Sequence, residues 1–215
     1  MYFNYMKITL EEIRQVLSSN NISINGCIHV GAHDCEELPI YNELQIKSED
    51  VIWIEGNPSK VQESQDRGIP NVYKAVISDK DDEDVVLNIS NNTDSSSILQ
   101  FETHSQEYPY IYYVGALSTT SITLDTFFDR NGIDPSKCDF WNFDIQGAEL
   151  LALKGATRSI AYAKLIYLEV NEKELYKNCG LIGEIDVFLS NYNFKRVLTR
   201  MGYEGWGDAI YILNT

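Results

Sequence analysis

Short apolar runs alternate with amphipathic stretches along the chain, and this alternation predicts the order of its secondary structure. Apolar runs of roughly four to eight residues bounded by turn residues are typical of buried strands. Such runs lie at residues 26–30, 51–57, 71–78, 83–90, 140–147 and 164–170. Stretches with helical spacing or helix-boundary residues lie at 11–20, 36–44, 58–68, 148–156 and 181–194, and a short strand and helix are expected over 122–132.

This order predicts an α/β fold with a mainly parallel sheet. The end of the chain differs, because the apolar runs 195–200 and 208–213 follow one another across the turn MGYEGWG. We therefore expect an antiparallel hairpin at one edge of the sheet. Without repeats or a low-complexity linker, residues 1–215 are expected to form a single domain, which opens with an N-terminal helical segment at 1–22.

The segment 91–121 is the least regular part of the sequence. It is rich in Ser, Thr, Asn and Tyr, and it shows neither a helical nor a strand-like period. Long irregular segments in compact domains are usually functional or disordered. We expect this segment to be a loop that covers a substrate.

Composition narrows the range of functions. The formal net charge is −15 and the pI is about 4.5, which disfavours nucleic-acid binding, since that requires a basic face. No two of the four cysteines have C-x-x-C spacing, so reduced thiols are expected rather than a disulfide or zinc site. The sequence shows no signal-peptide pattern and no apolar run long enough for a membrane span. We expect a cytoplasmic protein.

Ligands of such sheets bind beyond the carboxyl ends of the strands, and the residues there are the candidate site. Gly31 ends the first predicted strand, where a missing side chain lets a ligand approach the backbone. Glu55 ends the second strand, 24 positions after Gly31. A carboxylate at this place can accept hydrogen bonds from both ribose hydroxyls of a nucleoside. A solvent-facing strand end is the alternative for Glu55.

Three further polar residues end the fourth and fifth core strands. Asp144 follows an aromatic run, and a buried carboxylate is costly without partners, so we interpret it as a site residue. Glu169 and Asn171 are two apart on one strand and should face the same way. The three could hold a sugar hydroxyl or a divalent cation such as magnesium, or could anchor a loop by hydrogen bonds. Glu149 is better explained by the dipole of the helix that follows.

The chain has three histidines, and each has a different expected environment. His29 lies inside the first strand and is expected to be a core residue with satisfied hydrogen bonds. His33 lies on the turn after Gly31 and could line a cofactor pocket. His104 lies in the polar segment, where it could act as a general base or could be an ordinary surface histidine.

The motifs together resemble the FkbM-type methyltransferases, which use S-adenosylmethionine. The motifs IHVGAH, IWIEGNPSK, KAVISDKD, FDIQGAELLALKGA and IYLEVN occur in the order found in that family. The resemblance extends from about residue 26 to residue 213, and FDIQGAELLALKG is its most specific part. It implies a class I methyltransferase fold, a Rossmann-like three-layer sandwich with a seven-stranded sheet, and O-methylation of sugars or polyketide-type products.

The resemblance also implies roles for residues of the cofactor site. Gly31 and its neighbours would hold the methionine part of S-adenosylmethionine, Glu55 would hold the ribose, and Asn57 with the end of the third strand would flank the adenine. The residues implied in cofactor binding are Gly31, Ala32, His33, Glu36, Glu55, Gly56, Asn57, Val76, Ser78, Asp79 and Asp144. A glycine-rich loop is not required, because this cofactor has no pyrophosphate.

The chain departs from the common family pattern at three positions. His29 stands where an acid is usual, Cys35 stands where a second glycine is usual, and Gln146 replaces an acid. We expect Glu36 or Glu37 to compensate by binding the positively charged side of the cofactor.

Methyl transfer to a hydroxyl requires an aligned acceptor and a base. Asp144 is the first candidate base and His104 is the second. Asp144, Glu169 and Asn171 also resemble the metal ligands of catechol-type O-methyltransferases, so they are candidate magnesium ligands. The residues expected to contact a small-molecule or glycan acceptor are Ser96, Ser97, His104, Glu169, Asn171 and Trp206.

Two alternatives remain open at this point. A dehydrogenase or epimerase would require G-x-G-x-x-G or Y-x-x-x-K, and the sequence has neither. A non-catalytic glycan-binding or assembly module on a methyltransferase scaffold is a different class. Cofactor binding distinguishes it from an enzyme.

Overall fold

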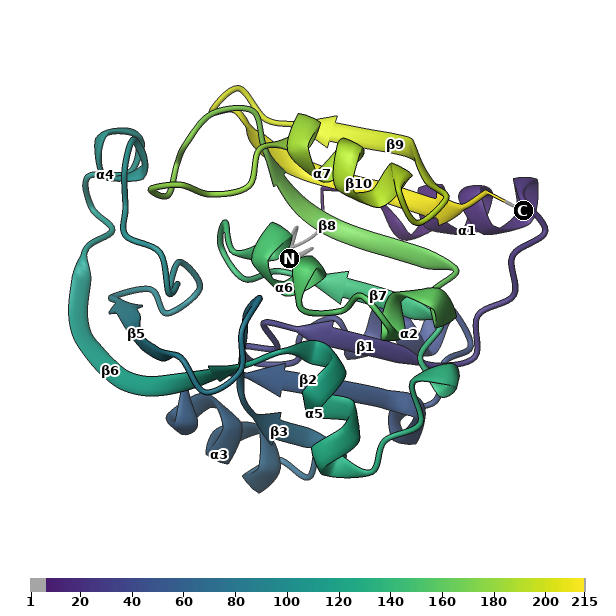
Figure 1. Cartoon of the computed structure of the whole chain (residues 1–215), viewed down its shortest axis with the longest axis horizontal. Coiled ribbons are helices and arrows are strands. Elements are labelled where there is room, and N and C mark those ends of the chain that lie inside the picture. The colour runs from purple at the N-terminus through teal and green to yellow at the C-terminus, as the bar shows by residue number, and fades with distance from the viewer. Residues whose placement is uncertain (1–6, 215) are drawn as a thin grey trace.

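The computed structural model describes residues 7–214, and a seven-stranded sheet forms its centre (Figure 1). The strands follow one another across the sheet in the order β3 (Val72–Lys74), β2 (Val51–Glu55), β1 (Cys27–Val30), β7 (Phe140–Phe143), β8 (Leu165–Asn171), β10 (Trp206–Leu213) and β9 (Phe194–Met201). The pairs from β3 to β8 are parallel, and β10 is antiparallel to both of its neighbours. This confirms the predicted α/β fold and the antiparallel C-terminal hairpin.

Helices cover both faces of the sheet and make three layers. One face carries α1 (Leu10–Ser19), α2 (Leu38–Glu43) and α3 (Pro58–Asp66), and the other carries α5 (Leu124–Asn131), α6 (Glu149–Lys154) and α7 (Ile182–Ser190). Single turns of 3₁₀ helix lie at Ser48–Asp50, Pro135–Lys137 and Ser159–Tyr162. A capping box begins α1: the Thr9 hydroxyl accepts a hydrogen bond from the Glu12 N–H, and the Glu12 carboxylate accepts one from the Thr9 N–H. Residues 1–6 of the predicted N-terminal segment lie outside the described residues.

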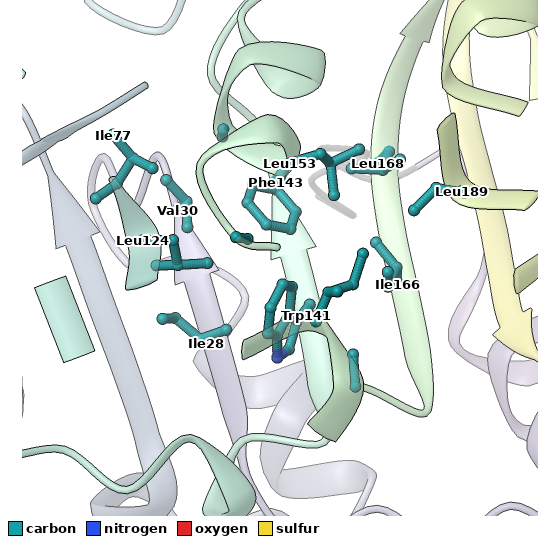
Figure 2. Packing of buried hydrophobic residues seen from close by; sticks show 14 of the residues in the cluster. Ile28, Val30, Ile77, Leu124, Trp141, Phe143, Leu153, Ile166, Leu168 and Leu189 are labelled. Atoms are coloured by element: carbon teal, nitrogen blue, oxygen red, sulfur yellow. The ribbon is translucent and has the colours of Figure 1, made fainter. Parts of the chain in front are cut away.

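The two faces of each central strand belong to two different cores, because side chains alternate along a strand. Ile28 and Val30 of β1 pack with Trp141 of β7 and Leu168 of β8 on the face covered by α5, α6 and α7 (Figure 2). Cys27 of β1 packs into the other core, against α1 and α2. Because both faces are buried, the central strands read as continuous apolar runs. All four cysteines are buried and unpaired.

A second, three-stranded sheet corrects two sequence predictions. It is formed by β4 (Val76–Ile77), β6 (Tyr113–Ile122) and β5 (Asp84–Ser90). The run 71–78 is therefore two strands, since the chain leaves the large sheet after β3 and continues as β4 beside β6. Residues 113–121, which were expected to be irregular, form most of β6. Burial, not residue type, alternates along residues 117–121, as in a strand with one exposed face, and β6 is paired antiparallel with β5.

The segment between β5 and β6 reaches across the carboxyl edge of the large sheet. It contains the short helix α4 (His104–Glu107), and β6 arches along one end of the molecule to meet it (Figure 1). Backbone N–H groups of Glu102 and His104 donate to the carbonyl of Leu175 at 2.8 and 3.1 Å, and Lys177 N–H donates to Gln100 at 2.7 Å. These bonds fasten the segment to the chain that follows β8. Within residues 7–214, no helix has the length and apolar character needed to cross a membrane.

Candidate active site

A cavity of about 340 Å³ lies at the carboxyl ends of β1, β2, β7 and β8, beneath the segment that joins β5 to β6. One end is lined by the turn after β1, by Glu55 and by apolar residues of the small sheet. The other end is lined by His104, Tyr108, Tyr176 and Trp206. A cavity of this size suits a small cofactor, and its two ends differ in chemistry.

The turn after β1 brings the backbone close to the neighbouring strand. Gly31 has φ +94°, and a Cβ on it would lie 1.8 Å from the carbonyl oxygen of Asp144. Its N–H donates to the carbonyl of Ile54 at 2.8 Å. Only glycine fits this place, so the single glycine of the turn has a packing reason as well as a conformational one.

Glu55 lies on the cavity wall and is held by two backbone groups. The N–H of His33 donates to Oε2 at 2.9 Å, and the N–H of Asn57 donates to Oε1 at 2.6 Å. Burial raises the pKa of Glu55, while these hydrogen bonds oppose the rise. Each carboxylate oxygen keeps a second lone pair that can accept a hydrogen bond from a ligand.

His33 connects the turn to the segment 92–97 on the opposite side of the cavity. Its Nδ1 lies 3.2 Å from Oε1 of Glu36, and its Nε2 lies 2.9 Å from Oδ1 of Asp94 and 2.7 Å from the hydroxyl of Thr93. Burial lowers the pKa of His33, but the hydrogen bonds and charges of Asp94 and Glu36 outweigh it and raise the pKa to about 10. His33 is therefore an imidazolium near neutral pH. His33, Glu36 and Asp94 are also close enough to share a metal ion. Among the described residues, this is the one cluster of three or more His, Cys, Asp or Glu side chains with that property.

Asp144 and Glu169 converge on the side chain of Gln146. The Nε2 of Gln146 donates to Oδ1 of Asp144 at 2.7 Å and to Oε2 of Glu169 at 2.9 Å. Burial raises the pKa of Asp144 to about 6, although the bond from Gln146 opposes the rise. Burial, and then the nearby Asp144 and Glu149 carboxylates, raise the pKa of Glu169 well above its usual range.

Glu149 organises the loop after β7 instead of facing a ligand. Its Oε1 accepts hydrogen bonds from the N–H groups of Ile145 at 3.0 Å and Gly147 at 3.2 Å. Burial raises its pKa to about 7. Glu149 was expected to interact with the dipole of the helix. The structure shows direct hydrogen bonds from the turn that leads into α6.

His104 faces the other end of the cavity from an aromatic cluster. Its ring stacks on Phe101 at 4.2 Å and lies 5.3 Å from the ring of Tyr176. Burial lowers its pKa and so favours the neutral ring. Within the described residues its buried Nδ1 has no hydrogen-bond partner. A buried, unpaired nitrogen is costly, and a ligand hydroxyl could satisfy it.

Trp206 closes the same end of the cavity. Its indole Nε1–H donates to the hydroxyl of Tyr108 at 2.8 Å, and the ammonium of Lys7 lies 3.7 Å from the ring centroid. Tyr110 lies at the rim and is 68% exposed. This end therefore offers aromatic faces and hydroxyl groups, but no cationic side chain among the residues that line it.

Comparison with known proteins identifies this combination of fold and site. The model of the Methyltransferase FkbM domain matches residues 29–196. The chain belongs to the FkbM methyltransferase family. It is thus a methyltransferase that depends on S-adenosylmethionine, which confirms the family, the enzyme class and the cofactor predicted from the sequence.

Two relatives are similar to this FkbM methyltransferase over different shares of its length. The 2-O-methyltransferase NoeI of Sinorhizobium fredii is 30% identical over 83 residues, which are 39% of this chain and 33% of NoeI. The crystal structure of Methyltransferase FkbM from Methylobacillus flagellatus KT superposes with a TM-score of 0.51 at 19% identity, covering 88% of this chain and 44% of that one. The chain therefore spans less than half the length of either relative, and the second comparison supports the fold alone.

Most of the residues that the sequence nominated for the FkbM site line the cavity. Those that line it are Gly31, Ala32, His33, Glu36, Glu55, Gly56, Asn57, Val76, Ser96, Ser97, His104, Asp144, Glu169 and Trp206. The structure thus brings together residues from four strand ends and from the segment 91–121. Their individual roles remain predictions.

Three nominated residues do not line the cavity. Ser78 and Asp79 were expected beside the adenine, but the switch into the small sheet carries them away, and Ser78 N–H bonds to Ile122 of β6. Asn171 was expected beside Glu169. It does lie on the same strand as Glu169, but it does not line the cavity: it is fully buried, and neither polar atom of its side chain has a partner among the described residues.

His29 also differs from its expected environment. Its Nδ1 lies within hydrogen-bond distance of the Tyr41 hydroxyl, at 2.9 Å, while its buried Nε2 has no partner within residues 7–214. Burial lowers its pKa to about 3. The core histidine is therefore neutral and only half satisfied.

Several residues that line the cavity had no signal in the sequence. Tyr176 follows β8 in a stretch without periodicity, and Thr93 and Asp94 are ordinary polar residues of an irregular segment. Leu87 lines the cavity because β5 belongs to the second sheet, which the sequence did not predict. Gln146 was noted as a departure from the family pattern, but its contacts could not be foreseen.

Proposed function

We propose that this FkbM methyltransferase transfers a methyl group to a hydroxyl of an uncharged sugar or glycan. The observation that carries the proposal is the end of the cavity at His104, where aromatic rings surround an Nδ1 that has no hydrogen-bond partner within residues 7–214. We take this to be the acceptor end. Aromatic faces and hydroxyl groups suit the binding of sugars. The local similarity to a 2-O-methyltransferase supports an oxygen acceptor.

The cofactor end fits S-adenosylmethionine. Glu55 has free lone pairs for the ribose hydroxyls, and Val76, Ile77 and Leu87 provide an apolar wall for the adenine. Glu36 and Asp94 place carboxylates near the turn at Gly31, where a positively charged amino group would be held. The bound cofactor supplies an activated methyl group on a sulfonium, and it leaves as a neutral thioether.

The protein must align the acceptor and take up its proton. Asp144 is the first candidate base, because its Oδ1 is fixed by Gln146 and its raised pKa makes it a stronger base than an ordinary aspartate. His104 is the second candidate, since its lowered pKa leaves the ring neutral and able to accept a proton. Tyr176 lies between them, because its hydroxyl donates to Oε1 of Gln146 at 2.6 Å and its ring faces His104.

Charge argues that the acceptor is not an anion. The cavity is lined by six acidic side chains, those of Glu36, Glu37, Glu55, Asp94, Asp144 and Glu169. The lining contains two cationic side chains, and both are paired: the His33 imidazolium lies 3.2 Å from Glu36 and 2.9 Å from Asp94, and the Lys60 ammonium lies 3.2 Å from Asp34. A phosphate or carboxylate on the acceptor would therefore meet acidic side chains and no unpaired cation among these lining residues.

The test is transfer of labelled methyl from S-adenosylmethionine to a panel of methyl glycosides, with the matching sugar phosphates as controls. We expect label on uncharged sugars only, and a rate about 10²-fold or more lower in Asp144→Asn or in His104→Gln, whichever removes the base. Labelling of the sugar phosphates, or of an amine in preference to any sugar, would contradict the proposal.

A further inference from the structure

The side-chain amide of Gln146 occupies the point where two acidic side chains of the cavity meet. Asp144 comes from the end of β7 and Glu169 from the end of β8. Both accept a hydrogen bond from the same atom, Nε2 of Gln146, at 2.7 and 2.9 Å. One nitrogen therefore separates the two carboxyl groups.

The position of this amide is fixed at its other atoms as well. Oε1 of Gln146 accepts the hydroxyl proton of Tyr176 at 2.6 Å, which assigns the nitrogen to the side of the carboxyl groups. The backbone carbonyl of Gln146 accepts the hydroxyl proton of Ser97 at 2.8 Å, and the residue has φ +55°. The turn, the aromatic cluster and the segment 91–121 thus all hold Gln146 in place.

Two carboxyl groups that converge inside a cavity repel each other when both are ionised, and a cation or a hydrogen-bond donor between them relieves this repulsion. A divalent cation would bind one oxygen from each group. A primary amide gives a neutral solution, because its NH₂ group carries two hydrogens and each can bond to one carboxyl oxygen. Both hydrogens of Gln146 are used in this way.

We propose that Nε2 of Gln146 takes the place of a divalent cation between Asp144 and Glu169, so that the methyltransferase holds its acidic cluster without a metal at this point. The inference concerns the same cavity as the proposed function and rests on it for its catalytic meaning. The sequence suggested magnesium bound by Asp144, Glu169 and Asn171, whereas this inference assigns the bridging position to the side-chain amide of Gln146. Gln146 is accordingly a positioning residue, which fixes one oxygen of Asp144 and leaves the other for the acceptor.

The experiment uses Mn²⁺ alone as the probe and needs neither cofactor nor acceptor. Free Mn²⁺ is measured by electron paramagnetic resonance during titration of the full chain. All proteins carry Glu36→Gln, which removes the other candidate cation cluster at His33 and Asp94. The variants compared in this background are the parent, Asp144→Asn, Gln146→Glu, and Gln146→Glu with Asp144→Asn.

We expect the parent to bind no Mn²⁺ at millimolar concentration. Gln146→Glu brings three carboxylates together and should gain one site that binds at least tenfold more tightly, and the added Asp144→Asn should abolish it. The inference is overturned if the parent binds Mn²⁺ and Asp144→Asn removes that binding. It is also overturned if folded Gln146→Glu gains no Mn²⁺ site, because the carboxyl groups of Asp144 and Glu169 would then not be close enough to bind the same cation.

A second variant keeps the test decisive if Gln146→Glu does not fold, which circular dichroism would show. Gln146→Ala removes the amide and opens the space between Asp144 and Glu169, so it should also gain Mn²⁺ binding. Absence of binding in folded Gln146→Ala would count against the inference. Because no cofactor is present, these outcomes are independent of whether the protein binds S-adenosylmethionine.

Discussion

His29 shows how one buried side chain can tie stability to pH. The ring is fully enclosed between Tyr41 and Trp53, and its Nδ1 is engaged by the Tyr41 hydroxyl. Burial lowers its pKa to about 3, whereas an unfolded chain has a histidine pKa near 6.5. At pH values between these two pKa values, the unfolded state therefore binds a proton that the folded state does not bind.

The sign of the effect follows from this difference. As pH falls below 6.5, His29 should lower the free energy of unfolding by roughly 1.4 kcal/mol per pH unit. Urea unfolding at pH 8, 7, 6 and 5 would measure it in wild type and in His29→Leu. We expect the free energies of unfolding of the two proteins to differ by a constant amount from pH 8 to 7. Below pH 7, wild type should lose stability relative to His29→Leu. Parallel curves down to pH 5 would contradict the assigned burial.

The residues of the site were predictable where strand ends determine their position. Gly31, Glu55, Asp144 and Glu169 each follow a clear apolar run, and the ends of parallel strands meet at one edge. Asn171 shows the limit of this reasoning. It shares a strand face with Glu169, but it lies one step beyond the edge of the cavity, and spacing alone does not say where a cavity ends.

At the scale of elements, the turn after β1 depends on a close approach of two backbones. Gly31→Ala places a methyl group 1.8 Å from the carbonyl oxygen of Asp144, in addition to an unfavourable positive φ. We expect a loss of at least about 3 kcal/mol in the free energy of unfolding, because backbone cannot move aside as a side chain can.

Gly68 provides the matched control for this prediction. It also has a positive φ, +78°, but nothing lies within 4 Å of the position of a Cβ. Gly68→Ala should therefore cost only about 1–2 kcal/mol of backbone strain. Equal losses in the two variants, measured by urea unfolding, would show that the contact with Asp144 is not decisive.

The elements that the sequence missed are those of the small sheet. The central strands are buried on both faces and form apolar runs in the sequence, so their existence and their order along the chain were predictable. β6 carries polar residues on its exposed face, and its partner β5 precedes it by a long segment. Strand pairing across such a segment leaves no local pattern. The split of the run 71–78 into β3 and β4 has the same cause, since its second half pairs with β6.

At the scale of the whole molecule, negative charge should favour a cationic ligand. The net charge is −15, and six carboxyl side chains line the cavity. S-adenosylmethionine carries a sulfonium charge that S-adenosylhomocysteine lacks. Because salt screens charge interactions, raising NaCl from 20 to 500 mM should weaken binding of S-adenosylmethionine several-fold more than binding of S-adenosylhomocysteine. Equal salt dependence of the two dissociation constants would show that the cavity charge does not act on the sulfonium.

The role of the cavity as a cofactor site depends above all on Glu55. Its carboxylate ends β2, it is held by the N–H groups of His33 and Asn57, and it retains lone pairs toward the cavity. Isothermal titration calorimetry with S-adenosylmethionine and S-adenosylhomocysteine should be carried out on wild type, on Glu55→Ala and on Glu49→Ala, which changes an exposed glutamate outside the cavity. We expect Glu49→Ala to bind each ligand as tightly as wild type does, and Glu55→Ala to bind each ligand at least tenfold more weakly than wild type. Folded wild-type protein that binds neither ligand, or Glu55→Ala that binds as well as wild type, would contradict the assignment of this cavity to the cofactor.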